Sequence, residues 1–390
     1  MSIIDLPPEL LSHILSFSTN PDDHSVCKDW NTELNYQKIS TLNDPDRFIN
    51  KLHPNIKFLI NDHEYRRKIL RLIGKRGRLD LLDSYKDYFT KNWFLKKALK
   101  ISCRFNQRSV INFFIRKGAH YWNMGMAGAA QGGHKDIVNF YIAHGANNWN
   151  KALYYAARGG NKDLVEFLMS KGAWKLKKGI ASAAKGGHMD LIEFFISNGA
   201  DDWNYGMANA AEGGNKNLID FFIANGANAW NLAMSYAARG GHKDLIDFFI
   251  SKGANDWNMG MRCAAEGGHN DLVDFFISKG SDDYDIGMKY AAQKGHKHLV
   301  EFFISKGASW WDTGMSCAAR GGHKDLVVFF ISKGADNWNE GMCSSAQGGH
   351  KDLVEFFISK GANNRYGGIL SAERGGHYDL VDFFQSTHKY

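Results

Sequence analysis

The stretch Trp257–Lys279, with the sequence WNMGMRCAAEGGHNDLVDFFISK, decides the fold because close copies of it recur every 27 residues. The glycine before the His slot marks the register, and its copies are Gly133, Gly160, Gly187, Gly214, Gly241, Gly268, Gly295, Gly322, Gly349 and Gly376. A fixed period of this length is typical of a solenoid, in which neighbouring units bury one another. We therefore expect one elongated body that binds other molecules and is not an enzyme.

Two helices are predicted in each unit, because apolar residues recur with a helical period and no stretch alternates as a strand does. The first helix is expected to begin at an Asn or Asp that caps its free amides, and to end at the Gly-Gly pair. This capping slot holds Asn123, Asn150, Asn204, Asn231, Asn258, Asp285, Asp312 and Asn339, and Lys177 and Tyr366 interrupt it. The second helix should begin near Asp271 and lie wedged between two others. We predict an all-α fold, a right-handed αα-solenoid.

The composition excludes several classes of protein. No stretch approaches the roughly 20 consecutive apolar residues of a membrane span. The first residues, MSIIDLPPELLSHIL, show no basic segment before an apolar run and so do not predict a secretory signal. Five cysteines, an odd number in a chain of 390 residues, favour a reducing compartment. An intracellular, soluble protein is expected.

The repeated unit resembles the ankyrin repeat. AAEGGHNDLVDFFISKG (Ala264–Gly280) is similar to the AA-x-x-GH-x-x-(I/V)-V-x-x-L-L-x-x-G pattern of that family. An ankyrin unit has about 33 residues and carries a T-P-L-H segment after a β-hairpin loop. Here only Asn255–Cys263 lies between one unit and the Ala-Ala pair of the next, which is too short for that hairpin. The resemblance implies a binding protein with ankyrin-like helix pairs but without β-hairpin fingers.

A second resemblance lies at the amino-terminal end. LPPELLSHILSF (Leu6–Phe17) and HSVCKDWNTEL (His24–Leu34) resemble an F-box, whose pattern is LP-x-E-LL-x-x-IL followed by V-C-x-x-W. The matching residues are Leu6, Pro7, Glu9, Leu10, Leu11, Ile14, Leu15, Val26, Cys27 and Trp30. In that family the segment docks on the adaptor protein of SCF-type ubiquitin ligases, so the resemblance implies that adaptor as a partner. Because the link from Phe17 to Val26 is shorter than in the family, a purely structural cap on the stack is the alternative.

Together the two resemblances give a domain plan and a function. An F-box-like segment at 1–40 precedes a linker or extra helices at 41–65, degenerate ankyrin-like repeats at 66–118 and the regular array at 119–390. Nearly identical repeats behind an F-box resemble proteins of giant DNA viruses of amoebae, which implies action in the host cytoplasm. The expected function is that of a substrate receptor that links a target protein to a host ligase. A binding scaffold without ligase recruitment is the alternative.

The slots that differ between copies predict the target-binding face. On the first helix they are the first, fourth, fifth and eighth positions after the Asn/Asp slot, which share one helix face. Their occupants include Tyr154, Tyr155, Arg158, Tyr205, Glu212, Tyr236, Arg239, Met259, Arg262, Glu266, Lys289, Tyr290 and Arg320. We expect this Tyr- and Arg-rich face to line the concave side of the stack and to bind the target, with neutral drift of an exposed face as the alternative.

The charge of the chain, +7 overall, is concentrated near its start. Residues 1–50 hold 3 Lys/Arg against 8 Asp/Glu, residues 51–118 hold 18 against 5, and the rest is nearly neutral. A solvated face is the simpler interpretation of the basic block, and the alternative is an acidic partner or nucleic acid. Nucleic-acid binding through 66–117 is therefore a second alternative function. A nucleic-acid binder of this size would usually extend its positive stripe along the array, so a protein target and a monomeric chain are expected.

Two further columns suggest sites but are better explained by packing. The His column (His134, His188, His242, His269, His296, His323, His350 and His377) is spaced one helix apart, too far for a shared zinc ion. Each His is expected to bond backbone at the turn between helices. The Trp column (Trp122, Trp149, Trp203, Trp230, Trp257, Trp311 and Trp338) should pack between repeats, with an aromatic ladder for a partner as the alternative. No metal, cofactor or catalytic residue is predicted.

Overall fold

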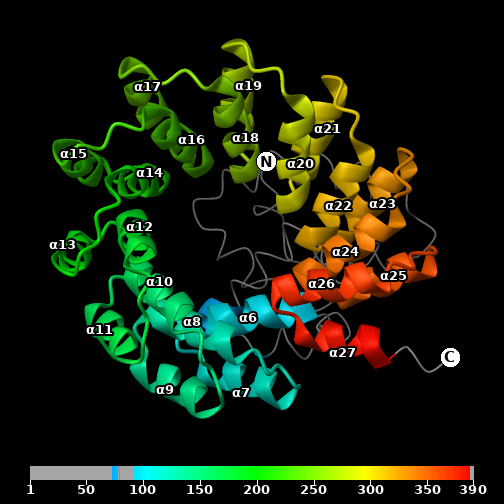
Figure 1. Ribbon diagram of the computed structural model, residues 1–390, viewed down its shortest axis with the longest axis horizontal. Coiled ribbons are helices and arrows are strands. Elements are labelled where there is room, and N and C mark those ends of the chain that lie inside the picture. The colour runs from blue at the N-terminus through cyan, green and yellow to red at the C-terminus, as the bar shows by residue number, and fades with distance from the viewer. Residues whose placement is uncertain (1–72, 78, 80–91, 387–390) are drawn as a thin grey trace, which may run out of the picture. The chain divides into compact units, whose positions relative to one another are not determined.

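The computed structural model describes residues 73–77, 79 and 92–386, and every regular element in this part of the chain is a helix (Figure 1). The chain divides into two units, Met1–Lys57 and Phe58–Tyr390, and all the described residues belong to the second. Within them the predicted all-α solenoid is confirmed. The F-box-like segment and the linker at 41–65 lie outside the described residues.

Each unit of the array contains two helices, as predicted: from α8 onward the first has 11 residues and the second 9, and α6 has 13. The first helices are α6 (Asn92–Arg104), α8 (Trp122–Gly132), α10 (Trp149–Gly159), α12 (Leu176–Gly186), α14 (Trp203–Gly213), α16 (Trp230–Gly240), α18 (Trp257–Gly267), α20 (Tyr284–Lys294), α22 (Trp311–Gly321), α24 (Trp338–Gly348) and α26 (Arg365–Gly375). The second helices are α7 (Arg108–Arg116), α9 (Lys135–Ala143), α11 (Lys162–Ser170), α13 (Met189–Ser197), α15 (Lys216–Ala224), α17 (Lys243–Ser251), α19 (Asn270–Ser278), α21 (Lys297–Ser305), α23 (Lys324–Ser332), α25 (Lys351–Ser359) and α27 (Tyr378–Ser386). A short loop, such as that from Ser251 to Trp257, replaces the β-hairpin finger.

The helices form two rows along a curved path. The first helices make the inner row and pack on one another, and the second helices make the outer row (Figure 1). The inner contact is made by buried small residues such as Ala264 and Ala265, whereas each outer helix carries Phe and larger aliphatic residues. Because small side chains let the inner helices approach more closely than the outer ones, the array bends toward the inner row. Among the described helices none is long and apolar enough to cross a bilayer.

The core of each unit is built from the second helix. In α19, Leu272, Val273 and Phe276 are buried, and the neighbouring Phe275 ring stands edge-on to Phe276 at 5.3 Å between centroids. Phe275 is only partly buried, and the Nζ of Lys243 lies 3.9 Å from the centroid of its ring. The first Phe of the pair therefore closes the outer surface while the second fills the interior.

The predicted helix caps are wrong by two residues. The first helices begin at the Trp slot, and the residue before it is the cap: the Asp256 side chain accepts a hydrogen bond from the Met259 amide at 3.0 Å. The Asn/Asp slot instead lies inside the first turn and bonds to the next unit. Asn204 Oδ1 accepts from the amides of Asn228 at 2.8 Å and Ala229 at 2.9 Å. We call this pair of bonds the inter-repeat clamp.

The inter-repeat clamp recurs along the array, except where Lys177 and Tyr366 replace the Asn or Asp. Its acceptors are Asn123, Asn150, Asn204, Asn231, Asp285, Asp312 and Asn339, each bonded to two amides 24 and 25 residues on. Asn258 accepts from the Asp282 amide and the Ser281 hydroxyl. Lys177 has no acceptor and pairs instead with Asp201, with Nζ and Oδ1 2.9 Å apart. Tyr366 lies on α26, in the last unit that the structure describes.

The His column bonds backbone, as predicted. His269 Nε2 lies 3.2 Å from the carbonyl oxygen of Arg239 in the preceding inner helix, and six other members make the same contact. Where Asn215 fills the slot, its Nδ2 donates to the Ala184 carbonyl at 3.0 Å. A Cβ added to Gly267 would lie 2.5 Å from the same Arg239 oxygen, so this close approach favours glycine, although Lys294 fills the same slot on α20. The next residue, Gly268, has φ +86°, the left-handed cap that was expected.

The array extends to residues before the regular copies. Asn106 takes the place of the second glycine and has φ 56°, and Gln107 takes the place of the His and donates from Nε2 to the Lys75 carbonyl at 2.9 Å. The curved path also brings its two ends together. Lys96 Nζ on α6 lies 3.4 Å from Nδ1 of His377, between α26 and α27.

Removal of one inter-repeat clamp should loosen the loop that it holds. Asn204→Ala deletes the acceptor for the amides of Asn228 and Ala229, and we expect a local loss of about 1–2 kcal/mol, because two amides lose a partner. Hydrogen exchange of those two amides measures this loss directly. Asn204→Asp should keep the protection, since Asp285 clamps in the same way, and Asn228→Ala is the matched control. Unchanged exchange in Asn204→Ala would refute the clamp.

Acid should weaken the array near its carboxy-terminal end. Burial lowers the pKa of His350, and burial followed by the charge of Lys96 lowers the pKa of His377 from 6.5 to about 4. An unfolded His binds its proton near its ordinary pKa, so the stability contributed by these neutral rings is present above about pH 6.5 and is lost as the pH falls toward 4. Urea unfolding at several pH values measures this decline.

Asn variants provide the control for the pH experiment. Replacing both His350 and His377 with Asn, the residue found in this slot at Asn161 and Asn215, should keep the backbone bond and flatten the decline. If the variant and the parent lose stability in parallel between about pH 6.5 and pH 4, other groups are responsible.

Candidate interaction surface

The residues predicted to bind a target all lie on the inner row of helices. They belong to α10, α14, α16, α18, α20 and α22, and Figure 1 places these helices on the inner side of the curve. Arg158 and Tyr205 are exposed, and the other members of the set are partly buried. The structure therefore places the set on one face and shows that much of it is covered by neighbouring inner helices.

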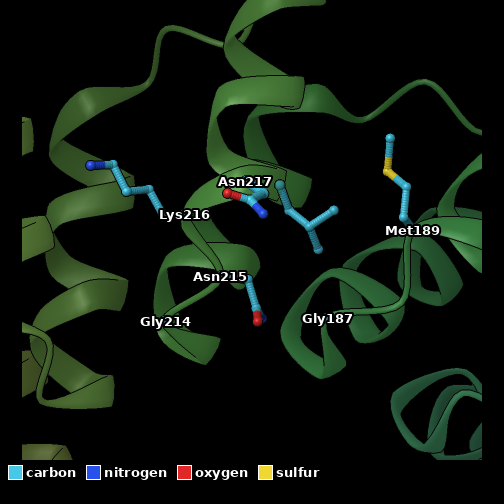
Figure 2. Close-up of a pocket in the computed structure, with 7 residues that line it drawn as sticks. Gly187, Met189, Gly214, Asn215, Lys216 and Asn217 are labelled. Carbon is cyan, nitrogen blue, oxygen red and sulfur yellow. The ribbon is translucent and has the colours of Figure 1, made fainter.

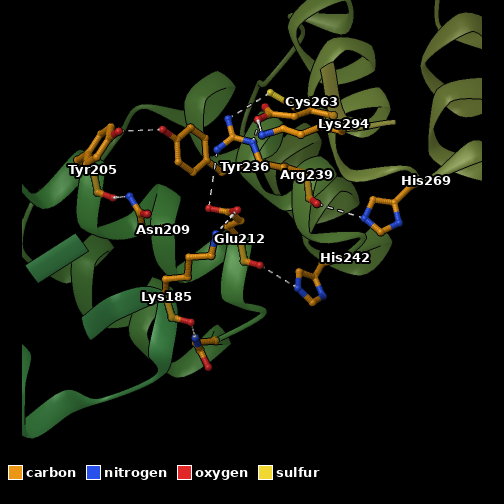
Figure 3. Close-up of polar contacts among 12 residues, drawn as sticks. Lys185, Tyr205, Asn209, Glu212, Tyr236, Arg239, His242, Cys263, His269 and Lys294 are labelled. Atoms are coloured by element: carbon orange, nitrogen blue, oxygen red, sulfur yellow. Dashed lines mark hydrogen bonds and ion pairs between the residues drawn. The ribbon is translucent and has the colours of Figure 1, made fainter. Parts of the chain in front are cut away.

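A ladder of alternating charges crosses this face. Lys185 pairs with Glu212, and Arg239 NH1 lies 3.8 Å from Glu212 Oε2. Arg239 Nε and Lys294 Nζ each lie 3.0 Å from a carboxylate oxygen of Glu266. Figure 3 shows these contacts. We call Lys185, Glu212, Arg239, Glu266 and Lys294 the charge ladder. These residues lie on five successive inner helices, from α12 to α20.

Much of the charge ladder is shielded from solvent. The Glu212 side chain is only 10% exposed and that of Arg239 only 24%. Burial opposes the charge of Arg239, but Cys263, Glu266 and Glu212 together raise its pKa. Three predicted recognition residues, Glu212, Arg239 and Glu266, are therefore engaged with one another rather than free for a partner.

Aromatic residues on this face also pair between units. The Tyr236 hydroxyl donates to the Tyr205 hydroxyl at 3.0 Å, and the Arg239 guanidinium lies 4.3 Å from the Tyr236 ring centroid (Figure 3). Burial and then the hydrogen bond to Tyr205 raise the pKa of Tyr236 to about 12. Arg262 likewise lies over the Tyr290 ring at 5.0 Å.

The start of the inner row differs because Lys100, Lys151 and Arg158 have no carboxylate partner among the described residues. Tyr154 and Tyr155 are partly buried on α10. Lys100 Nζ lies 3.7 Å from the Tyr155 ring centroid, and Lys178 Nζ lies 6.0 Å from that of Tyr154. The sequence analysis singled out the two tyrosines and Arg158 but missed Lys100, Lys185 and Lys294. Four members of the charge ladder occupy the eighth position after the Asn/Asp slot, and this regular spacing could have predicted their contacts. They are Lys185, Glu212, Arg239 and Glu266.

One open hollow lies on a different part of the array, at the turns between first and second helices. It has a volume of about 540 Å³, and Gly187, Met189, Gly214, Asn215, Lys216, Asn217 and Leu218 line it (Figure 2). Lys216 is the only titratable side chain in this lining, and Asn215 is already bonded to the preceding unit. None of the predicted target-binding residues lines it, and its lining offers no acid–base pair for chemistry.

The remaining reactive side chains have structural surroundings. Cys103 is buried with its Sγ 3.0 Å from the Tyr141 hydroxyl, and burial raises the pKa of the thiol to about 12. No group of three or more His, Cys, Asp or Glu in the described part of the chain could hold a metal ion. The Trp column is partly buried and packs against the core, and Trp203 lies 6.5 Å from the Phe222 ring centroid of its own unit; packing of the column between repeats stays a prediction.

Comparison with known proteins finds a similarity to a repeat family in part of the array. A family model of ankyrin repeats, in three copies, matches residues 126–206. This region runs from α8 to the beginning of α14. A search of curated proteins found no match. Ankyrin repeats, together with an inner face that varies from unit to unit, indicate a protein–protein interaction scaffold.

Neutralising Glu212 should destabilise the inner row. Glu212→Gln leaves Lys185 and Arg239 half-buried without that carboxylate, and we expect a loss of about 1–3 kcal/mol in the free energy of unfolding of these units. Denaturant unfolding measures the loss, and a double variant with Lys185→Gln should recover part of it. Glu193→Gln on the exposed side of α13 is the matched control. Equal effects of Glu212→Gln and Glu193→Gln would contradict a stabilising role for the ladder.

Proposed function

We propose that this chain is a substrate-receptor subunit, in which the amino-terminal segment recruits an SCF-type ubiquitin ligase and the ankyrin repeats hold a target protein. The observation that carries the proposal is the F-box-like pattern of Leu6–Phe17 and His24–Leu34 directly before an interaction scaffold. A ligase-recruiting segment requires a second module that binds the target, and in this proposal the repeat array is that module. The proposed setting is the host cytoplasm, where such ligases act.

The chain needs no chemistry of its own for this role. Holding a ligase and a target on one chain raises the effective concentration of one near the other, which accelerates transfer without a catalytic residue. Leu10, Leu11, Ile14 and Leu15 recur at helical spacing and form the apolar stripe for the ligase adaptor. The inner row of helices supplies the face for the target, with Arg158 and Tyr205 as its exposed members.

A two-armed binding experiment tests the proposal. The purified ligase adaptor should be captured by the full chain, and Leu10→Asp with Ile14→Asp should abolish capture, because charge in the apolar stripe prevents burial. An Arg158→Glu variant of the inner face should capture the adaptor as well as the parent does. Failure of the parent to capture the adaptor, or capture undiminished by the Asp substitutions, would leave a binding scaffold without ligase recruitment.

A further inference from the structure

The first four inner helices carry an unusual excess of positive charge. Helices α6, α8, α10 and α12 contain nine Lys or Arg residues and no Asp or Glu. Later inner helices alternate in sign, with Glu212 on α14, Glu266 on α18 and Glu340 on α24. The cations from Lys100 to Lys178 therefore form a bounded region. We define the basic face as Lys100, Lys151, Arg158 and Lys178 with Tyr154 and Tyr155.

The geometry of the basic face brings its cations around one tyrosine. Lys100 on α6 reaches past α8 to stand 3.7 Å from the ring centroid of Tyr155 on α10. This reach is possible because α8 presents only Ala127 and Gly128 between them. A Cβ at Gly128 would lie 2.3 Å from the Lys100 carbonyl oxygen, so the two helices are in close contact there.

Lys100, Lys151 and Arg158 on the basic face repel one another electrostatically. Burial, and then Lys151 and Arg158, lower the pKa of Lys100, although Tyr155 opposes this. Burial raises the pKa of Tyr155, but Lys100, Lys151 and Arg158 outweigh it and hold that pKa below its ordinary value. Lys100, Lys151 and Arg158 form no ion pair with any carboxylate among the described residues. In the charge ladder, by contrast, every cation has a carboxylate partner.

The length of the basic face along the inner row indicates which class of anionic ligand fits it. A nucleic-acid strand bound along the inner row would run on to the charge ladder, where the cations already have carboxylate partners and offer its phosphates little attraction. A short acidic peptide can end before α14. The four helices lie about 8–10 Å apart, so the face matches about ten residues of extended chain. The two tyrosine rings provide an apolar flank for aromatic or aliphatic side chains of the same peptide.

We infer that the basic face binds an acidic peptide segment of the target protein, with Asp or Glu carboxylates at Lys100, Lys151 and Arg158 and an apolar side chain against Tyr154 and Tyr155. The inference rests on the proposed role of the array as the target-binding module. It names the chemistry of that target, which the sequence left open. Residues 1–40 take no part in it, so it is independent of whether the ligase adaptor binds.

The test measures binding of a defined peptide to the full chain. The probe is a fluorescent peptide of about ten residues, rich in Glu and Asp with one Leu and one Tyr, and its Gln/Asn counterpart is the neutral control. Fluorescence anisotropy should show binding of the acidic peptide alone, and raising the salt concentration should weaken it. An oligonucleotide of the same charge should bind more weakly.

Charge-matched variants locate the site. Lys151→Glu with Arg158→Glu should reduce the affinity at least about tenfold, and the milder Lys151→Gln with Arg158→Gln should reduce it less. Lys162→Glu with Lys216→Glu makes the same change of net charge on the exposed outer helices and should leave the affinity unchanged. Hydrogen exchange of the inner helices checks that each variant is folded.

Three results would overturn the inference. Equal weakening by the inner and outer charge reversals would mean attraction by net charge alone. Tighter binding of the oligonucleotide than of the peptide would assign the face to nucleic acid. No binding of the acidic peptide at low salt would remove the site. In each case capture of the ligase adaptor by the same preparation reports separately on the proposed function.

Discussion

Consecutive inner helices approach so closely that a backbone carbonyl of one unit lies where a Cβ of the next would be. At Gly267 that carbonyl belongs to Arg239, and His269 donates to the same oxygen, so a polar group buried by the close approach keeps a partner. The Ala pair, the first glycine and the His slot all serve this one contact. The bulkier outer helices hold their row apart, and the difference between the two rows bends the array.

The same close approach governs the variable positions. Eighth-slot side chains of successive units stand one helix apart, so a charge there meets the charge of the next unit before it meets solvent. Between α12 and α20 opposite signs alternate, and the result is the partly buried charge ladder. Between α6 and α12 the charged side chains of the inner helices are all basic, and Lys100, Lys151 and Arg158 have no carboxylate partner among the described residues. The inner surface of the solenoid is therefore divided into the charge ladder, whose charges pair with one another, and the basic face, which attracts anions.

The repeat period and the glycine register were enough to predict the helix pairs, the left-handed turn at Gly268 and the backbone role of the His column. Prediction failed for the Asn/Asp slot, because a cap and a clamp use the same residue type and differ only in which unit supplies the amide. It also failed to separate Arg239, engaged in the charge ladder, from Arg158, which is exposed on the same face. Both errors concern contacts between units, which a comparison of single copies does not reveal.

The contact of Lys96 with His377 joins residues 281 positions apart. In most solenoids a unit can be gained or lost by tandem duplication with little penalty, since each copy depends only on its neighbours. Here each added or deleted copy would turn the last helix pair away from the first and separate these two side chains. The contact between Lys96 and His377 therefore depends on the number of units between α6 and α27.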